Sequence, residues 1–142
     1  MSPTMSNTQQ GQFSVNSGED LTGKEGYLVE LATSSGKTTA TLPNADADLA
    51  LFLVEDGGAS GEQSVVRPIL GTAQVRVKAK GTGNAGDRLV NAAVSTAADK
   101  GKLRALPGTA GDYRVVAIAL ESFVDGQLVK VAPASLGIIT VS

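Results

Sequence analysis

Two glycine-rich segments could carry phosphate chemistry. Residues 81–86 read GTGNAG and match the G-x-G-x-x-G pattern, whose glycines let a pyrophosphate approach the backbone at a helix N-terminus. Such a site also needs a parallel β-α-β unit and an acidic residue that ends the next strand. The next extended run, residues 102–106, continues into Pro107 and Gly108 and supplies no carboxylate there. We therefore predict that residues 81–86 form a turn between strands.

The second segment, Ser35-Gly36-Lys37-Thr38, resembles the end of a phosphate-binding P-loop. The complete motif places a glycine five residues before Gly36, and Leu31 occupies that position. A P-loop also opens a helix, whereas residues 38–41 read TTAT and favour helix poorly because threonine is β-branched. This segment is also predicted to be a turn.

Metal and acid–base chemistry have few candidate residues. Asp46 and Asp48 are spaced as in a calcium loop, but Ala50 stands where the next oxygen ligand belongs, which indicates solvated turn carboxylates. The chain has no cysteine and no histidine, so disulfides, thiolate metal sites and the commonest general base are excluded. A serine–lysine dyad stays open, because burial can depress the pKa of a lysine. We predict no catalytic residue, no cofactor and no metal site.

Residues 111–114 read GDYR and are similar to a segment of the trimeric dUTP pyrophosphatases, which are also small β proteins. The glycine-rich C-terminal tail with an aromatic residue that marks those enzymes is missing here. A small trimeric nucleotide-binding β-barrel enzyme is therefore kept as an alternative function.

The composition is that of one folded domain and argues against a nucleic-acid partner. The chain has 142 residues, of which 42% are hydrophobic and 18% charged, and its net charge is −2. Nucleic-acid binding needs a dense face of lysine and arginine, and none is visible. The apolar stretches 49–54 and 115–120 are too short to span a bilayer, and residues 1–11 lack the features of a signal peptide. We expect synthesis in the cytoplasm and no membrane partner.

Alternating apolar residues and frequent turn residues predict an all-β chain. Residues 74–78 show the pattern well, with Val75 and Val77 on one side and the charges on the other. Similar runs predict strands at 12–16, 27–32, 38–42, 49–54, 64–67, 89–94, 102–106, 113–120, 127–131 and 138–141. Short strands with glycine-rich turns are typical of a barrel or sandwich. We predict a mainly β fold, a small β-barrel or β-tulip-like domain.

The second half of the chain repeats the plan of the first. Five landmark pairs recur 64 to 66 residues apart, at positions 43/107, 48/112, 55/121, 61/126 and 68/133. This spacing predicts an internally duplicated strand unit, with repeats at about 24–69 and 84–134. Both repeats would lie in a single β domain, residues 17–142, which follows an extended, flexible N-terminal arm, residues 1–16.

One segment fits two structures. Residues 87–99 could form a helix, with Asp87 as the N-cap and an apolar stripe from Leu89 to Ala97. The match with residues 26–43 instead favours a hairpin. The sequence leaves both open and favours the hairpin.

Five segments resemble the capsid cement, or decoration, proteins of tailed bacteriophages. They are residues 42–45 (LPNA), 51–58 (LFLVEDGG), 75–78 (VRVK), 86–90 (GDRLV) and 125–129 (DGQLV). The resemblance covers about residues 17–141 and consists of turn-and-strand patterns. It implies a small β-barrel or β-tulip domain, commonly trimeric, that sits on the outer surface of the mature capsid, stabilises the lattice and has no catalytic residues.

The implied partners are the major capsid protein and further copies of this chain in a homotrimer. Gln12, Phe13 and Val15 are the candidate capsid contacts, because a short strand in the arm can add to the sheet edge of a neighbouring subunit. A different virion role, as a tail or host-adhesion β domain, is the other alternative. Adhesion favours exposed aromatic residues, and aromatic residues make up only 4% of the chain.

Overall fold

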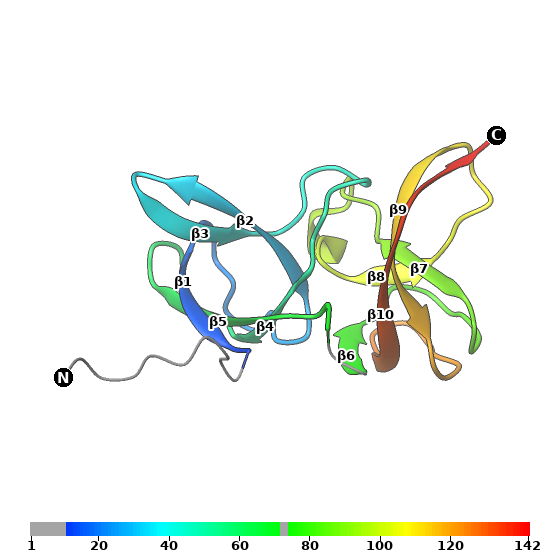
Figure 1. Cartoon of the computed structure of the whole chain (residues 1–142), viewed down its shortest axis with the longest axis horizontal. Helices are drawn as coiled ribbons and strands as arrows, with labels where there is room; N and C mark the ends of the chain where they lie inside the picture. Colours follow the sequence, from blue (N-terminus) through cyan, green and yellow to red (C-terminus); the bar gives the residue numbers. More distant parts are fainter. Residues whose placement is uncertain (1–10, 72–73) are drawn as a thin grey trace.

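The computed structural model describes residues 11–71 and 74–142, and it confirms the mainly β class (Figure 1). The strands are β1 (Phe13–Ser17), β2 (Leu28–Ser34), β3 (Lys37–Thr41), β4 (Phe52–Asp56), β5 (Gln63–Pro68), β6 (Val75–Lys78), β7 (Arg88–Asn91), β8 (Leu103–Ala105), β9 (Gly111–Ala119) and β10 (Leu128–Val141). A 3-10 turn at Ala97–Asp99 is the helical element of these residues. Within the two described ranges, no helix is long and apolar enough to cross a bilayer.

The first five strands close into a barrel, in the order β1-β3-β2-β4-β5. Neighbouring strands are antiparallel, except that β1 meets β3 in a short parallel pair at Asn16–Thr39 and Ser17–Ala40. Each strand contributes one small apolar residue to the barrel interior; these are Val15, Val29, Ala40, Val54 and Val66. The predicted β-barrel is thereby confirmed.

The last five strands form a second sheet, in the order β6-β10-β9-β7-β8. Its two edges meet, because a parallel bridge joins Ala79, just after β6, to Leu103 on β8. The Lys80 N–H donates to the Leu103 carbonyl at 2.7 Å beside this bridge. Read as a ring from β6, the order is β6-β8-β7-β9-β10, which is the order of the first barrel with every strand number raised by five. This sheet, whose edges meet at the single bridge, is called the second barrel below.

Equivalent hydrogen bonds close equivalent turns in the two barrels. The Gly61 N–H donates to the Ser17 carbonyl at 2.8 Å, and the Gly126 N–H donates to the Ala79 carbonyl at 2.9 Å. Both glycines adopt a left-handed backbone, with φ of 82° and 84°. Gly61 and Gly126 are one of the landmark pairs of the sequence, so this geometry supports a repeated unit.

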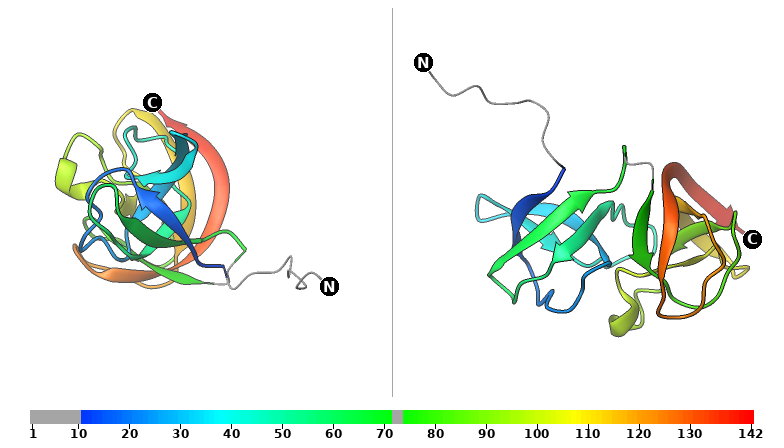
Figure 2. Two further views of the ribbon diagram at one scale, coloured as in Figure 1. Left: turned by 90° about the vertical axis from the view of Figure 1, so that its left-hand side faces the viewer. Right: turned by 90° about the horizontal axis from the view of Figure 1, so that it is seen from below.

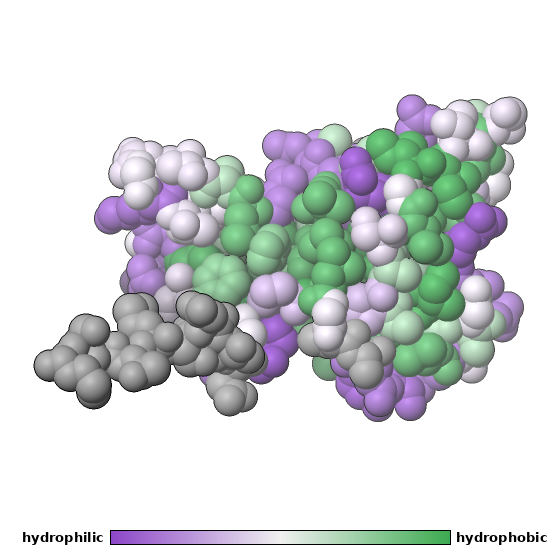
Figure 3. Space-filling view, viewed as in Figure 1, coloured by the Kyte–Doolittle hydropathy of each residue, from purple (hydrophilic) through white to green (hydrophobic). Residues whose placement is uncertain are grey.

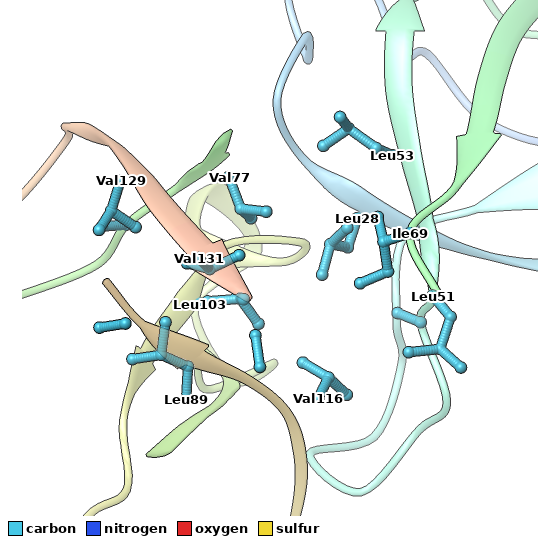
Figure 4. Packing of buried hydrophobic residues seen from close by; sticks show 14 of the residues in the cluster. Leu28, Leu51, Leu53, Ile69, Val77, Leu89, Leu103, Val116, Val129 and Val131 are labelled. Atoms are coloured by element: carbon cyan, nitrogen blue, oxygen red, sulfur yellow. The ribbon is translucent and has the colours of Figure 1, made fainter. Parts of the chain in front are cut away.

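One apolar core belongs to both barrels. The barrels lie side by side along the long axis of the molecule (Figures 1 and 2). Buried side chains of the first barrel meet those of the second in a single cluster (Figure 4). The labelled members are Leu28, Leu51, Leu53 and Ile69 from the first barrel and Val77, Leu89, Leu103, Val116, Val129 and Val131 from the second. The molecule is therefore held together by burial between its halves as well as inside each of them.

Neighbouring residues of one strand are buried in different apolar clusters. On β2, Leu28 belongs to the shared cluster and Val29 to the interior of the first barrel. On β4, Leu53 and Val54 divide in the same way. Successive side chains of a strand point to opposite faces, so an apolar run marks a strand that is buried on both.

The boundary predicted for the N-terminal arm is wrong. Phe13–Asn16 pair with Gln63–Val66 of β5 in antiparallel register and so form part of the first barrel. The physical reason is the alternation that buries Val15, which is 2% exposed, in the barrel interior. Residues 1–10 of the predicted arm lie outside the described residues.

The segment 87–99 takes the hairpin that the sequence favours. Leu89, Val90 and Asn91 on β7 pair with Ala105, Arg104 and Leu103 on β8. The loop between them contains the 3-10 turn Ala97–Asp99, which is the only part of the helical alternative that forms in this segment. Strand pairing prevails because Leu89 and Val90 are fully buried on the two faces of β7, in separate clusters.

Gly57→Ala is expected to destabilise the fold, because a Cβ atom at position 57 would lie 1.8 Å from the Leu21 carbonyl oxygen. That neighbour is backbone and cannot rotate away, so we expect a loss of roughly 3 kcal/mol or more in the free energy of unfolding. Gly108→Ala is the matched control, since a Cβ there meets no atom within 4 Å. Urea unfolding of both variants measures the difference, and equal stabilities would contradict the predicted close approach.

Candidate functional site

The glycine-rich segment 81–86 is a turn between strands, as predicted. Its three glycine N–H groups already have protein acceptors. Gly81 donates to Asp125 Oδ1 at 2.8 Å, Gly83 to the Phe123 carbonyl at 3.2 Å and Gly86 to the Ala119 carbonyl at 2.8 Å. The chain continues into β7 and not into a helix. A phosphate bound at this segment would have to displace these bonds.

The segment that resembles a P-loop is the turn of the β2–β3 hairpin. Ser34 pairs with Lys37, and the two residues between them have positive φ, 52° at Ser35 and 74° at Gly36. Two consecutive positive φ angles are typical of the tight turns that match the twist of paired strands. The prediction of a turn is confirmed.

The segment 111–114, which resembles part of the dUTP pyrophosphatases, forms the start of β9. Thr140 on β10 donates its hydroxyl to Asp112 Oδ1 at 2.7 Å. The buried Tyr113 donates its hydroxyl to the Thr109 carbonyl at 2.9 Å. The Arg114 Nε–H donates to the Ala47 carbonyl of the first barrel at 2.9 Å. The polar groups of this segment therefore join strands and barrels.

Residues 44–48, here called the clamp loop, reach from the first barrel onto the second. The buried Asn91 donates its Nδ2–H to the carbonyls of Asp46 and Asp48, at 3.2 and 2.8 Å. Asp46 Oδ1 accepts the Val94 N–H at 3.0 Å, and Asp46 Oδ2 lies 3.7 Å from the Arg104 guanidinium. The two aspartates considered for calcium thus fix the barrels together. The described part of the chain contains no group of three or more acidic side chains placed to hold a metal ion.

A cluster of charged side chains forms a second polar link between the barrels. Asp99 accepts a hydrogen bond from Lys102 Nζ at 3.0 Å and lies 3.5 Å from Lys80 Nζ. The hydrogen bond from Lys102 holds the pKa of Asp99 below its ordinary value of 3.8 against the opposing effect of burial. Lys102 also lies 5.9 Å from the ring centre of Tyr27 in the first barrel. These charges have structural partners on both sides of the junction.

Glu30 on β2 faces Asp48 of the clamp loop, and the two carboxyl groups interact. Burial raises the pKa of Glu30, and the negative charge of Asp48 and a hydrogen bond with Asp48 raise it further, to about 7 from 4.5. Asp48 Oδ2 meanwhile accepts the backbone N–H groups of Asn44 and Ala45 at 2.9 and 3.0 Å. Glu30, which faces the clamp loop from β2, therefore titrates near neutral pH.

The structure separates the three predicted capsid contacts. Gln12 lies on the surface, where its Oε1 accepts a hydrogen bond from the Arg67 guanidinium at 3.0 Å. Phe13 is 38% exposed, and its ring stands edge-on to Phe52 with centroids 6.0 Å apart. Val15 packs in the barrel interior, so it has no surface to offer in this fold. Contact with another protein through Gln12 and Phe13 stays a prediction.

The candidate surface that sequence reasoning missed is the outer face of β10, defined here by its exposed apolar residues Leu128, Leu136 and Ile138. Leu128, Leu136 and Ile138 on this face are 43%, 57% and 51% exposed. The odd-numbered Val129 and Val131 are fully buried in the shared core. Figure 3 shows apolar surface gathered over this side of the second barrel and continuing toward the junction. An exposed apolar surface of this kind is typical of a protein contact.

A signal for this surface was present in the sequence. The alternation that begins at Leu128 resumes at Ile138, but the sequence predicted two separate strands, at 127–131 and 138–141. In the structure, β10 runs through both residues with an irregular register between Pro133 and Gly137. Pro133 is tolerated because β6 pairs with β10 only from Leu128 to Val131, so no β6 carbonyl requires a donor at position 133.

Asn91→Ala is expected to loosen the junction, because it leaves the carbonyls of Asp46 and Asp48 without their donor. We expect a loss of roughly 2–3 kcal/mol in the free energy of unfolding. Asn84→Ala is the matched control, since Asn84 lies exposed in a turn. Thermal unfolding of both variants tests this, and an Asn91→Ala protein as stable as the control would show that the clamp loop does not hold the barrels.

Glu30→Gln is expected to stabilise the protein at high pH and to leave it unchanged at low pH. The unfolded chain releases the Glu30 proton near pH 4.5 and the folded protein near pH 7. The stability contributed by protonated Glu30 is therefore complete below pH 4.5 and is lost as the pH rises through 7. Glutamine stays uncharged, so the gain at pH 8 is roughly 1–2 kcal/mol after solvent screening.

Thermal melts of the wild type and of Glu30→Gln at pH 5 and pH 8 measure this effect. Glu62→Gln changes an exposed carboxyl to the same amide and is the control. A Glu30→Gln gain that is equal at both pH values would contradict the titration of Glu30.

Comparison with solved structures gives a likeness over most of the chain. No protein-family model and no curated protein sequence matches the chain. Among solved structures, the chain is similar to the head fibre gp8.5 N base of bacteriophage phi29, with a TM-score of 0.67. The likeness covers 87% of this chain and 92% of that chain at 15% sequence identity. The two proteins therefore share a fold.

Proposed function

We propose that this chain is a structural protein of a bacteriophage virion, and more closely a head decoration protein that binds the outer surface of the mature capsid and stabilises its lattice. The observation that carries the proposal is the fold shared with the phi29 head-fibre base over 87% of the chain. The resemblance of five sequence segments to capsid cement proteins points the same way. The proposed partners are the major capsid protein and two further copies of this chain.

The architecture suits a protein that acts through its shape. A single buried cluster spans both barrels, and the clamp loop adds direct hydrogen bonds between them. Such a body resists bending, so contacts made at one end are held in place relative to the other. Many identical contacts of modest strength then stabilise a shell through their number.

We assign the shell contact to the end of the molecule that carries β1. Gln12 and Phe13 are exposed there, whereas the C-terminus and the outer face of β10 belong to the other barrel (Figure 1). This arrangement leaves β10 free for a different contact. Aromatic side chains such as Phe13 contribute strongly when they fill a pocket of a partner.

The test of this function uses purified protein and undecorated mature heads of the encoding phage. We expect the protein to sediment with the heads, to saturate at a fixed ratio to lattice sites, and to raise the temperature at which the heads release DNA. Binding without a plateau, or no binding, would overturn the decoration function. Binding to host cells but not to heads would indicate adhesion, and nucleotide turnover that is lost in Asp112→Asn would indicate the enzyme alternative.

A double variant, Gln12→Ala with Phe13→Ala, tests the contact residues in the same assay. We expect head binding to weaken about tenfold, since truncation of an aromatic anchor costs more than 1 kcal/mol. Val124→Ala, which shortens an exposed apolar side chain on the other barrel, is the control. Melting curves of both proteins show whether they remain folded, and unchanged binding by the folded double variant would place the contact elsewhere.

A further inference from the structure

The charges of the chain are divided unevenly between its two halves. Residues 1–71 contain nine acidic and three basic residues, whereas residues 72–142 contain five acidic and nine basic residues. The first half therefore has a net charge of −6 and the second a net charge of +4, which together give the −2 of the whole chain. An excess of one sign on part of a protein surface attracts partners of the opposite sign.

Most acidic residues of the first half already have partners within the fold. Six of the nine accept hydrogen bonds from the chain itself, and these are Glu19, Asp20, Glu25, Asp46, Asp48 and Glu55. Five of the six have a backbone N–H group of a turn or loop as their donor. The excess of negative charge in the first half is thus explained by the turns and loops that it holds.

The strand register places basic side chains side by side on the outer side of the second barrel. Arg76 and Lys78 on β6 flank Val77, which is fully buried in the shared core (Figure 4), so both point outward. Lys130 on β10 stands directly opposite Arg76 and points the same way. We call Arg76, Lys78 and Lys130 the basic face. The surface between Arg76 and Lys130 is hollowed, with a volume of about 380 Å³.

The fold leaves two charges of the basic face without a counter-charge. Arg76 and Lys130 are like charges in directly opposite positions, an arrangement that costs stability in a sheet. Glu121 Oε1 lies 3.4 Å from the Arg76 guanidinium and offsets that charge. Among residues 11–71 and 74–142, no carboxylate lies within 4.0 Å of the Nζ atom of Lys78 or Lys130. Unlike the carboxylates of the first half, these two ammonium groups have no role inside the molecule, so they are suited to a partner.

The surroundings of the basic face favour a protein partner over a nucleic acid. Leu128 stands opposite Lys78, and Leu120 donates its N–H to the Lys130 carbonyl at 2.9 Å. The two leucines are 43% and 42% exposed, and apolar side chains of a protein can cover them, whereas a phosphate backbone has none to offer. The carboxylate of Glu121 beside these charges would also repel phosphate. A protein segment with both carboxylates and apolar residues meets both conditions.

We propose that the basic face, together with Leu120 and Leu128, binds an extended acidic segment of an unlike protein. A second copy of this chain fits less well, because its carboxylates are mostly engaged in its own turns and loops. Arg76 and Lys78 are two residues apart on a strand, which separates them by about 7 Å. Carboxylates on alternate residues of an extended segment have the same spacing, so the segment is expected to lie along β6 with its carboxylates toward the basic face.

The test measures the binding of a labelled peptide of about ten residues by fluorescence anisotropy. The acidic peptide has glutamate at alternate positions with leucine or serine between them, and the neutral peptide has glutamine in place of every glutamate. We expect the wild type to bind the acidic peptide more tightly than the neutral one. This affinity is expected to fall as the salt concentration rises from about 0.05 to about 0.5 M, because salt screens exposed ion pairs.

Three double variants locate the binding surface. Lys78→Gln with Lys130→Gln is expected to bind the acidic peptide about tenfold more weakly, since two exposed ion pairs are lost. Lys78→Arg with Lys130→Arg keeps both charges and is expected to keep the affinity. Lys37→Gln with Lys100→Gln removes two lysines outside the basic face, on β3 and in the loop between β7 and β8, and is expected to bind as the wild type does. Melting curves report whether each variant is folded.

Selective binding of the acidic peptide that weakens in the first variant, and not in the other two, supports the proposal. Equal binding of both peptides by the wild type, or equal binding of the acidic peptide by all four proteins, would overturn it. Tighter binding of a single-stranded oligonucleotide than of the acidic peptide would overturn the choice of a protein partner. Salt-sensitive self-association of the wild type without peptide binding would instead assign the basic face to a second copy. The assay contains no heads, so its result is independent of the decoration function.

Discussion

Burial of one apolar cluster between two barrels is the constraint on which the rest of the structure depends. A small closed barrel has an interior just large enough for a few side chains, such as Val15 and Val66 here. Each barrel alone would expose an apolar outer wall, as the shared position of Leu28 and Leu53 shows. Packing these walls together gives both barrels a larger core. The pairing of the two barrels is therefore a condition of their stability.

The shared core explains why the polar motifs are structural. Once two barrels must meet in one orientation, the loops at their junction need partners for buried backbone groups. Asp46 and Asn91 supply such partners across the junction. The glycines of segment 81–86 allow a tight turn whose N–H groups reach acceptors on the 119–125 side of the barrel. The same residue types that bind phosphate or calcium elsewhere here close turns and join loops.

The sequence predicted the strands and turns, which depend on local pattern, and it did not predict the features that depend on tertiary packing. Alternation located most strands, and the hairpin at 87–99 followed from its match with the first repeat. Val15 was recognised as one face of a strand, but nothing local says that this strand completes the molecule's own barrel and not a neighbour's sheet. The sequence predicted separate strands at 127–131 and 138–141, and the short reach of β6 shows why one strand can continue through Pro133. The apolar run at 49–54 predicted a strand, but which of its faces meets the second barrel is fixed by tertiary packing.

The long pairing of β10 with β9 has a mechanical consequence. The two strands are antiparallel from Ala119–Val131 to Gly111–Val141, and the chain leaves β10 at the far end of the molecule from β1 (Figure 1). Hydrogen bonds in such a pair lie across the strand direction. Tension applied at the C-terminus would load many of these bonds in shear at the same moment and would not open them one after another. A molecule attached at the C-terminus would therefore pull along the β9–β10 pair, the longest strand pairing among the described residues of the second barrel.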